Sequence, residues 1–569
     1  MVAADTVFVN GRVVTVDKRF SFKKAIAIKN GWIINVGENA DIRPYIGPHT
    51  QVIDLQGKMI LPGAHDSHCH GIVYGTNHLT CDCSYPKIKT ISDLQEIFRH
   101  KAQETPPGKW LRGNGLNPEN IIDCKESGRP LTRRDLDEVT PHHPVIILNW
   151  SGHSILVNSK ALEVCSIDEL TPDPPTGVME RDADGLLTGV CREAGAISLI
   201  SKNVPLWTNE EIRSSILAFQ QLLNQEGYTS YTESTLGPAG NLRDSGAGGE
   251  RGIAIYKQLL DEEQLTARVS IGFYSGQDGA QSYAHLRNDL DTFRFPELKD
   301  SQTNWLNIPM IKIFADGVHI GHTAWLIDDY TDQPGFHGRS CLAGATDEEQ
   351  EEELHRMILL AHERGWQVGI HTIGDRAIRS SLDGFIKAMQ AMPGKNPRHY
   401  LIHPEAMITN EMARKAAEYT ILMSVQPGLA DYLFEPSLEC IGSRGKRAFG
   451  LKELLYYGVV LAGGSDSLNG DYCNWRQAIE SAVTRRSRIS GKIYSPELAL
   501  TVEEGIRLYT YNGAYQENFE HVRGSIEIGK VADLQVLDQD IFMVDSQDIG
   551  KIKVVMTMVG GKIVYTKGL

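Results

Sequence analysis

The sequence predicts an α/β protein: a TIM-like (β/α)8 barrel with a large insertion after its first strand, plus a composite β-sandwich from both termini. Two observations support this prediction. Short β-branched runs separated by Asn-Gly or Gly-Gly fill both ends of the 569-residue chain, a pattern typical of antiparallel hairpins. Between them, apolar runs alternate with helical patterns, which indicates βα units and a parallel sheet.

The two chain ends are predicted to form β-hairpins. Two N-terminal turns are expected at Asn10-Gly11 and Asn30-Gly31, and a C-terminal turn at Gly560-Gly561. Because both ends are rich in strands and flank a different middle, we expect residues 1–60 and 520–569 to pair into one discontinuous β-sandwich domain. Two unrelated terminal sheets are the alternative.

Eight apolar runs in the middle of the chain are predicted to be the parallel strands of a barrel. They are residues 59–65, 228–233, 267–274, 309–315, 367–371, 399–403, 421–426 and 459–462. Helical patterns separate them, as at residues 347–364, where the acidic start of the run is typical of a helix's first turn. Since eight strands close a (β/α)8 barrel, we expect residues 61–519 to form one.

An insertion is predicted within the barrel. About 160 residues separate the first two predicted strands, which is too long for a loop. We expect residues 75–206 to form a separate insertion domain that acts as a lid.

Composition and charge exclude several classes of protein. With 57 Lys+Arg against 72 Asp+Glu, the net charge is −15, which argues against a nucleic-acid partner. The sequence contains no run of about 18 apolar residues, which is the length that predicts a membrane span. We therefore expect no membrane partner. No secretory signal is evident at the first residues, and nine Cys are too few for a disulfide scaffold. We therefore expect a soluble, cytoplasmic protein.

The most distinctive local pattern is the pair His68 and His70 at the end of the first predicted barrel strand. In an extended strand, residues two apart lie on the same face. Two imidazoles on one face can bind a first-row metal ion. Histidines that are merely solvated or packed are the alternative.

Four further polar residues lie in or at the ends of later predicted strands: Lys312, His371, His403 and Asp466. Lys312 lies inside an apolar strand, where a charged side chain is destabilising unless it is paired or used. In such barrels, catalytic residues come from the C-terminal ends of strands. Each residue alone is weak evidence, but six in barrel order predict a metal site.

These motifs resemble the amidohydrolase superfamily, and specifically its family 3, the YtcJ-like metal-dependent hydrolases. The resemblance runs nearly end to end. Besides the six residues, it includes Gly152-His153, residues 181–190, residues 312–317 and residues 524–534. It implies a TIM-like barrel, a composite sandwich and one or two divalent metal ions per subunit, commonly Zn²⁺. It also suggests a homodimer.

The resemblance implies roles for the histidines. His68 and His70 would bind the buried metal ion, and His371 and His403 would bind a second. The family usually has Glu before the last of these, whereas this sequence has Ile402. That departure puts a supporting role of the missing carboxylate in doubt, but not the role of the histidine.

The resemblance also implies that Lys312 bridges the metal ions as a CO₂-derived carbamate, and that Asp466 is both a metal ligand and the general base and acid. A lysine amine reacts with CO₂ only when it is neutral, so its pKa must be lowered by burial and nearby cations. If Lys312 is not modified, a one-metal site of His68, His70 and Asp466 is the alternative.

Four other residues are candidates for substrate contact. His153 belongs to the insertion and could reach over the barrel mouth. His319 and His322 follow Lys312 in an expected pocket loop, and Asp316 could orient metal ligands. A structural role is the alternative for each of them.

We therefore expect a metal-dependent hydrolase that cleaves an amide-type C–N bond of a small molecule through a metal-activated hydroxide. The bond could belong to an amide, an N-acyl or N-formyl compound, or a cyclic amide. A lyase or decarboxylase and an ester or lactone hydrolase are alternatives on the same scaffold. A catalytically silent interaction protein is disfavoured because all six residues are present.

Overall fold

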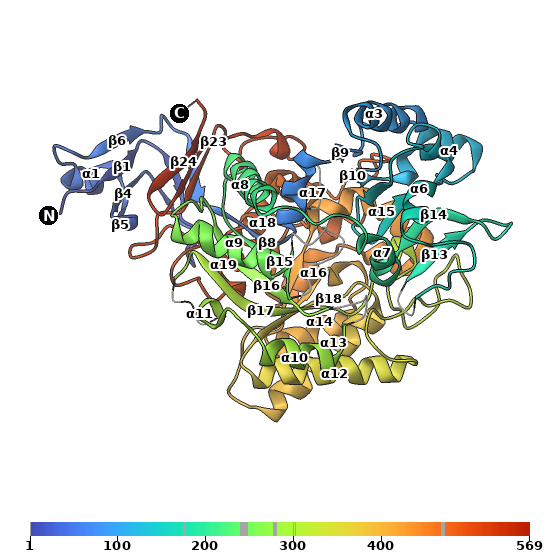
Figure 1. Ribbon diagram of the computed structural model, residues 1–569. Helices are drawn as coiled ribbons and strands as arrows, with labels where there is room; N and C mark the ends of the chain where they lie inside the picture. The colour runs from blue at the N-terminus through green and yellow to red at the C-terminus, as the bar shows by residue number, and fades with distance from the viewer. Residues whose placement is uncertain are drawn as a thin grey trace.

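The computed structural model describes residues 2–174, 177–238, 248–276, 281–299, 301, 303–467 and 473–568 (Figure 1). Their strands form four sheets: two from the chain ends, one in the insertion and one in a barrel. In Figure 1 the terminal sheets lie at the left with both chain ends, and the insertion lies at the upper right. Within this part of the chain, every helix is too short or too polar to cross a lipid bilayer.

The central sheet is a parallel, nearly closed barrel, as predicted. In chain order its strands are β8 (Ala64–Cys69), β15 (Tyr228–Leu236), β16 (Arg268–Tyr274), β17 (Leu306–Phe314), β18 (Gln367–His371), β19 (Tyr400–Ile402), β20 (Leu422–Val425) and β21 (Leu461–Gly463). Each pairs in parallel with the next. The first and last strands come together where the N–H of Asp466 donates to the carbonyl of His68 (2.8 Å). The C-terminal ends of the strands therefore meet at one rim.

Amphipathic helices cover the outside of the barrel. The longer ones are α8 (Asn209–Gln225), α9 (Glu250–Asp261), α10 (Tyr283–Asp291), α12 (Asp347–Glu363), α13 (Asp375–Ala391), α14 (Asn410–Glu418) and α17 (Trp475–Thr484). Helix α12 begins where the sequence predicts. The side chain of Thr346 accepts the N–H of Glu349, and acidic residues fill the first turn, where the helix dipole favours them.

The first predicted barrel strand, residues 59–65, is wrong, because two strands in two different sheets occupy this segment. Strand β7 (Met59–Pro62) pairs with strands of a terminal sheet, and only β8 belongs to the barrel. The chain changes sheets at Gly63, whose N–H donates to the carbonyl of Asp533 (2.8 Å). A Cβ on Gly63 would collide with Thr229, so the crossing needs glycine.

Strands from both chain ends form the predicted sandwich. One sheet has the order β5-β4-β1-β6 and the other β24-β23-β22-β7-β2-β3. Their bounds are β1 (Thr6–Val9), β2 (Arg12–Val14), β3 (Phe22–Lys23), β4 (Ala25–Lys29), β5 (Trp32–Gly37), β6 (Gln51–Asp54), β22 (Leu534–Leu537), β23 (Val554–Val559) and β24 (Lys562–Thr566). Phe8 and Ile26 of the first sheet share a buried cluster with Val536 and Met556 of the second.

Two of the three predicted hairpins are present. Strands β4 and β5 pair around Asn30-Gly31, and β23 and β24 pair around Gly560-Gly561. The hairpin predicted at Asn10-Gly11 is wrong, because β1 and β2 belong to different sheets. Gly11 permits this crossing because a side chain there would collide with Leu55.

The segment between β8 and β15 contains a mixed sheet of order β13-β14-β12-β11-β10-β9. Its strands are β9 (Cys81–Asp82), β10 (Leu111–Leu116), β11 (Val145–Asn149), β12 (Ser154–Val157), β13 (Val178–Arg181) and β14 (Leu187–Arg192). Helix α3 (Ile91–Glu104) packs on this sheet through Leu94 and Phe98, which are buried with Leu111 and Ile147.

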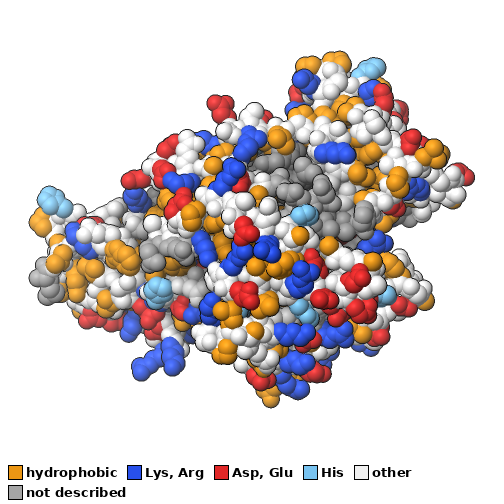
Figure 2. Space-filling view, turned by 60° about the horizontal axis from the view of Figure 1, so that its bottom comes forward, with side chains coloured by type: hydrophobic (Ala, Val, Ile, Leu, Met, Phe, Trp, Pro, Cys, Tyr) orange, Lys and Arg blue, Asp and Glu red, His pale blue; other side chains and the backbone are white. Residues whose placement is uncertain are grey.

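The surface carries charges of both signs. On the face of the molecule shown in Figure 2, acidic and basic side chains are interspersed.

A buried ion pair joins the barrel to the C-terminal sheet. Arg268 of β16 donates to both carboxylate oxygens of Asp533, at 2.7 and 2.9 Å. Both side chains are at most 4% exposed. The N–H of Gly560 also donates to this carboxylate (2.8 Å), and the Arg268 guanidinium lies over the ring of Trp305. A single carboxylate therefore ties a barrel strand to the hairpin of β23 and β24.

We expect Asp533→Ala to lower the free energy of unfolding by about 3–5 kcal/mol, because it leaves the buried charge of Arg268 uncompensated. Chemical denaturation followed by circular dichroism measures this change. The control is Lys551→Ala, which removes an ion pair whose side chains are 77% and 49% exposed and should cost less than about 1 kcal/mol. Equal effects of the two substitutions would contradict an anchoring role for the buried pair.

Candidate metal centre at the barrel rim

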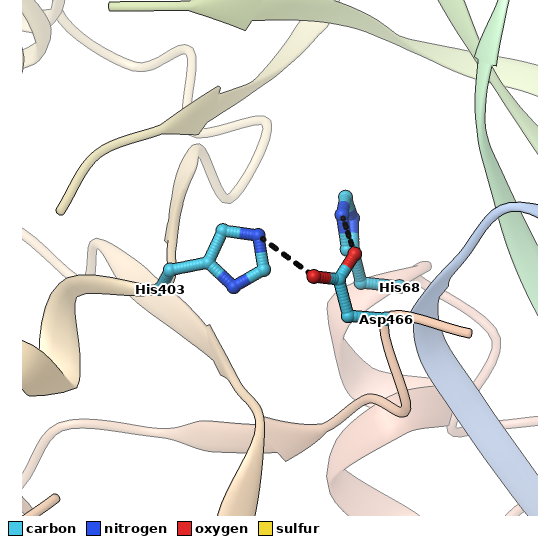
Figure 3. A group of neighbouring side chains, drawn as sticks. All are labelled: His68, His403 and Asp466. Carbon is cyan, nitrogen blue, oxygen red and sulfur yellow. Dashed lines mark ion pairs between the residues drawn. The ribbon is translucent and has the colours of Figure 1, made fainter. Parts of the chain in front are cut away.

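Asp466 lies among three histidines at the rim of the barrel. Its Oδ1 is 3.3 Å from the Nε2 atoms of both His68 and His70, and its Oδ2 is 3.8 Å from Nε2 of His403. Figure 3 shows the side chains of His68 and His403 on either side of the carboxylate. One ligand atom from each of these three residues lies within 4.8 Å of the others. The structure therefore brings together four of the six predicted metal ligands.

Two of these residues have a left-handed backbone, which is unusual outside glycine. The φ angle is +64° at His403 and +52° at Asp466. Each follows the end of a short strand, β19 or β21, so the turn directs the side chain to the rim. Such a conformation costs about 1–3 kcal/mol and is typical of functional sites.

Neighbouring polar groups fix two of the imidazole rings. Nδ1 of His403 hydrogen-bonds to the side-chain oxygen of Gln426 (2.5 Å), and Nδ1 of His70 hydrogen-bonds to Oγ1 of Thr235 (2.7 Å). Both contacts leave Nε2 facing Asp466. Hydrogen bonds of this kind set the orientation and tautomer of metal-binding histidines.

Burial and neighbouring charges keep the imidazoles of His68 and His403 neutral and the carboxyl group of Asp466 ionised. Burial lowers the pKa of His68 well below its usual value, and the charge of Lys312 lowers it further. Burial likewise lowers the pKa of His403 to about 4. Burial raises the pKa of Asp466, but His403, His68 and His70 outweigh it and hold that pKa well below its usual range. Neutral imidazole and carboxylate are the forms that bind metal ions.

The donor set fits a divalent cation such as Zn²⁺, which binds imidazole nitrogen and carboxylate oxygen. Donors about 2.1 Å from one tetrahedral ion lie roughly 3.4 Å apart. The distances of 3.3 Å from Asp466 to His68 and to His70 agree with this separation.

The other two predicted ligands lie beside this cluster. The ring of His371 is 4.8 Å from that of His403, and its Nε2 is 3.2 Å from the carbonyl oxygen of Gly317. Lys312 is fully buried in β17, with Nζ 4.6 Å from the centroid of the Phe314 ring. Its charge helps to lower the pKa of both His371 and His403, after burial as the main cause.

The insertion contributes His153, whose ring lies 5.4 Å from that of His371. Nδ1 of His153 donates to the carboxylate of Glu193 (3.0 Å), and the Glu193 N–H donates to the carbonyl of His153 (2.8 Å). Glu193 has a φ of +61°. A Cβ on Gly317 would lie 2.6 Å from its Oε1, so glycine there gives the carboxylate room.

The remaining candidates for substrate contact have different surroundings. His319 is buried, bonds to Oγ of Ser437 (2.7 Å) and lines a cavity with His403 and Asp466. His322 pairs with Asp332 (2.9 Å) and lines a separate outer cavity.

Asp316 is fully buried and holds the loop after β18. It accepts backbone N–H groups of Trp325, Ile373 and Gly374, at 2.7 to 3.0 Å. Its side chain therefore orders the segment that follows His371.

Two carboxylates near the site were missing from the sequence prediction. Glu193 was not singled out, although it follows the motif at residues 181–190 by three residues. Glu405 lies two residues after His403, accepts the N–H of Gln426 (2.7 Å) and lines the same cavity as His403. Burial raises the pKa of Glu405 to about 7. The sequence did carry a signal for Glu405, because it places an acidic residue two positions after the strand-end His403 instead of directly before it.

Comparison with known proteins gives consistent matches over nearly the whole chain. A family model described as "Amidohydrolase family" matches residues 51–565. The Bacillus subtilis protein named "Putative amidohydrolase YtcJ" is 30% identical over 549 residues, covering 96% of each chain. The N-substituted formamide deformylase of Arthrobacter pascens is 28% identical over 565 residues, covering 99% of this chain and 98% of its own.

Solved structures support the fold. The crystal structure of an uncharacterized metal-dependent hydrolase from Pyrococcus horikoshii matches with a TM-score of 0.71 and 22% identity. The match covers 95% of this chain and 99% of that one. At this identity, the match is evidence for the shared fold alone.

We expect His68→Ala to weaken Zn²⁺ binding at least about 10-fold, since it removes a nitrogen donor from the cluster. Isothermal titration calorimetry on metal-stripped protein measures the affinity. His100→Ala is the matched control, because His100 has a side chain 73% exposed on α3 and should leave Zn²⁺ affinity unchanged. Unchanged binding by His68→Ala would contradict a metal site at this rim.

Proposed function

The chain belongs to the amidohydrolase family, and from this premise we propose that it is a metal-dependent hydrolase of an amide-type C–N bond in a small molecule. The observation that carries the proposal is the contact of Asp466 with His68, His70 and His403 at the barrel rim. A relative that covers 99% of this chain is named for removal of a formyl group from N-substituted formamides. That name favours C–N cleavage over the lyase and ester-hydrolase alternatives.

We propose that the metal ions are divalent, with Zn²⁺ the best match to the donors. His68, His70 and Asp466 would hold the first ion, and His371 and His403 the second. A bound divalent ion lowers the pKa of a water molecule and polarises a carbonyl group. A one-metal site of His68, His70 and Asp466 is the second candidate.

Asp466 is the proposed general base and acid. As a carboxylate, it can accept a proton from the attacking water and then donate that proton to the leaving nitrogen. The water oxygen first forms a C–O bond to the carbonyl carbon, and the C–N bond then breaks as the nitrogen is protonated, so the products are a carboxylic acid and an amine. The low pKa of Asp466 means that it begins the cycle ionised.

Lys312 is the proposed bridging ligand. Its neutral amine would react with CO₂ to form a carbamate and release one proton, so the side chain would gain a negative charge with which to bind divalent metal ions. Full burial in β17 favours the neutral amine that this reaction requires.

His153 is proposed to contact the substrate from the insertion. Because Glu193 accepts its Nδ1–H, the Nε2 atom is the one available to a ligand, as in carboxylate–histidine pairs generally. There it can hydrogen-bond to the carbonyl oxygen or the nitrogen of the scissile bond. Glu193 is then a positioning residue.

Metal-replete protein should hydrolyse at least one compound in a panel of amides, N-formyl and N-acyl amines, cyclic amides and carbamates, with release of an amine. Asp466→Asn should lower kcat by about 10²–10⁴-fold, because the proton-transfer group is lost. Amine detection with metal content measured in parallel separates catalysis from metal binding. Release of alcohol or CO₂ without amine, or no turnover by metal-loaded protein, would contradict the proposal.

We expect Glu193→Gln to lower kcat/KM about 10-fold, because a neutral amide orients His153 less strongly and can stabilise the wrong tautomer. Glu193→Asp should restore part of the activity, whereas a purely structural role would show up in the thermal midpoint instead. Glu163→Gln is the matched control, since Glu163 lies in the same insertion and pairs with Lys160 through a side chain that is 69% exposed. Wild-type kcat and KM in Glu193→Gln would rule out the positioning role.

A further inference from the structure

Two cavities of unequal size meet at the candidate metal ligands. The larger has a volume of about 70 Å³ and the smaller about 30 Å³. Both are lined by His153, His371, His403 and Asp466. A substrate whose scissile bond lies at these residues would place one group in each cavity.

The larger cavity has mostly apolar walls. They include Trp150 from the insertion, Val318 and Ile320 after β17, Leu429 and Leu433 near the start of α15 (Ala430–Ile441), and Phe449. Leu433 and Phe449 belong to a buried apolar cluster that backs this wall. Besides the residues shared with the smaller cavity, His319 and Glu405 are the polar side chains in this lining. Against the remaining apolar wall a charged substituent would lose its hydration, whereas an alkyl or aryl group would gain contacts.

The smaller cavity leaves little room. Val73, Leu148, Gly152 and Phe314 line it together with the shared residues. Since one water molecule needs roughly 10–15 Å³ in this measure, 30 Å³ admits a group of only two or three heavy atoms.

Charged side chains gather further out. An outer cavity of about 460 Å³ is lined by Glu119, Arg192, His322 and Arg339, among others. A narrow cavity that Glu119 and Arg192 share with Trp150 and His153 links it to the inner site. Ionic groups are therefore accommodated outside the inner site rather than within it.

We propose that the substrate is an amide with an apolar alkyl or aryl group on one side of the C–N bond and a group of at most three heavy atoms on the other. This inference rests on the proposed amide hydrolysis and adds its substrate class. Either half can be the small one: an N-substituted formamide has a small acyl group, and a primary carboxamide has a small amino group.

A substrate series tests the size and charge preference. N-cyclohexylformamide and cyclohexanecarboxamide each have one apolar ring of six carbon atoms, which the larger cavity admits by the same measure, and one small half. N-formyl-β-alanine replaces the apolar half with a charged one, and N-cyclohexylbenzamide is large on both sides. We expect kcat/KM for at least one of the first two to exceed that for both others by at least about 10-fold.

Cavity variants test the walls directly. Leu429 is half-buried, and Leu429→Asp should lower kcat/KM for N-cyclohexylformamide at least about 10-fold more than for N-methylformamide. Val73→Ala enlarges the smaller cavity and should raise kcat/KM for a substrate with a longer small half: N-cyclohexylpropanamide relative to N-cyclohexylformamide, or N-ethylcyclohexanecarboxamide relative to cyclohexanecarboxamide. Leu170→Asp makes the Leu-to-Asp change at a side chain 89% exposed and should alter neither preference.

The outcomes separate this inference from the proposed function. Hydrolysis of the charged or doubly bulky amide as fast as the others would overturn the substrate class and leave amide hydrolysis intact. No turnover of any amide would instead overturn the proposed function. If Leu429→Asp fails to fold, as its thermal midpoint reports, Val73→Ala still decides: an unchanged preference contradicts the assignment of the smaller cavity.

Discussion

The contact between Asp466 and the imidazoles at the C-terminal ends of β8 and β19 depends on closure of the barrel. Asp466 follows the last strand and His68 lies in the first, and the N–H of one donates to the carbonyl of the other. About 400 residues of sequence separate them, so only a nearly closed ring of strands brings them together. Left-handed backbone at His403 and Asp466 is tolerated because the surrounding strands fix it. The rim thus gathers imidazole nitrogen donors around one carboxylate, whose side chain is 22% exposed.

The insertion and the barrel divide the site between them. The barrel supplies the candidate metal ligands, whereas the insertion supplies His153, Glu193 and the apolar wall at Trp150. Pairing of β12 with β14 places His153 and Glu193 side by side. Changes in this segment could therefore alter substrate choice without disturbing the metal ligands, which agrees with the general placement of specificity in loops above such barrels.

Local patterns in the sequence predict much of this structure. Apolar runs and helical periods indicate eight parallel strands, and the alternation of a strand explains why His68 and His70 face Asp466 together. Sheet membership is not local, which is why the crossings at Gly11 and Gly63 were mispredicted. Glu193 reaches His153 only through tertiary pairing, so no window of sequence around either residue could have revealed the contact.

The proposed hydrolysis requires a cation held by His68, His70 and Asp466. Anomalous X-ray diffraction at the zinc edge, on crystals of Zn²⁺-loaded protein, tests this directly. We predict a peak about 2.0–2.2 Å from Nε2 of His68 and His70 and from a carboxylate oxygen of Asp466. A well-ordered rim with no anomalous peak beside these three residues would contradict a metal site there.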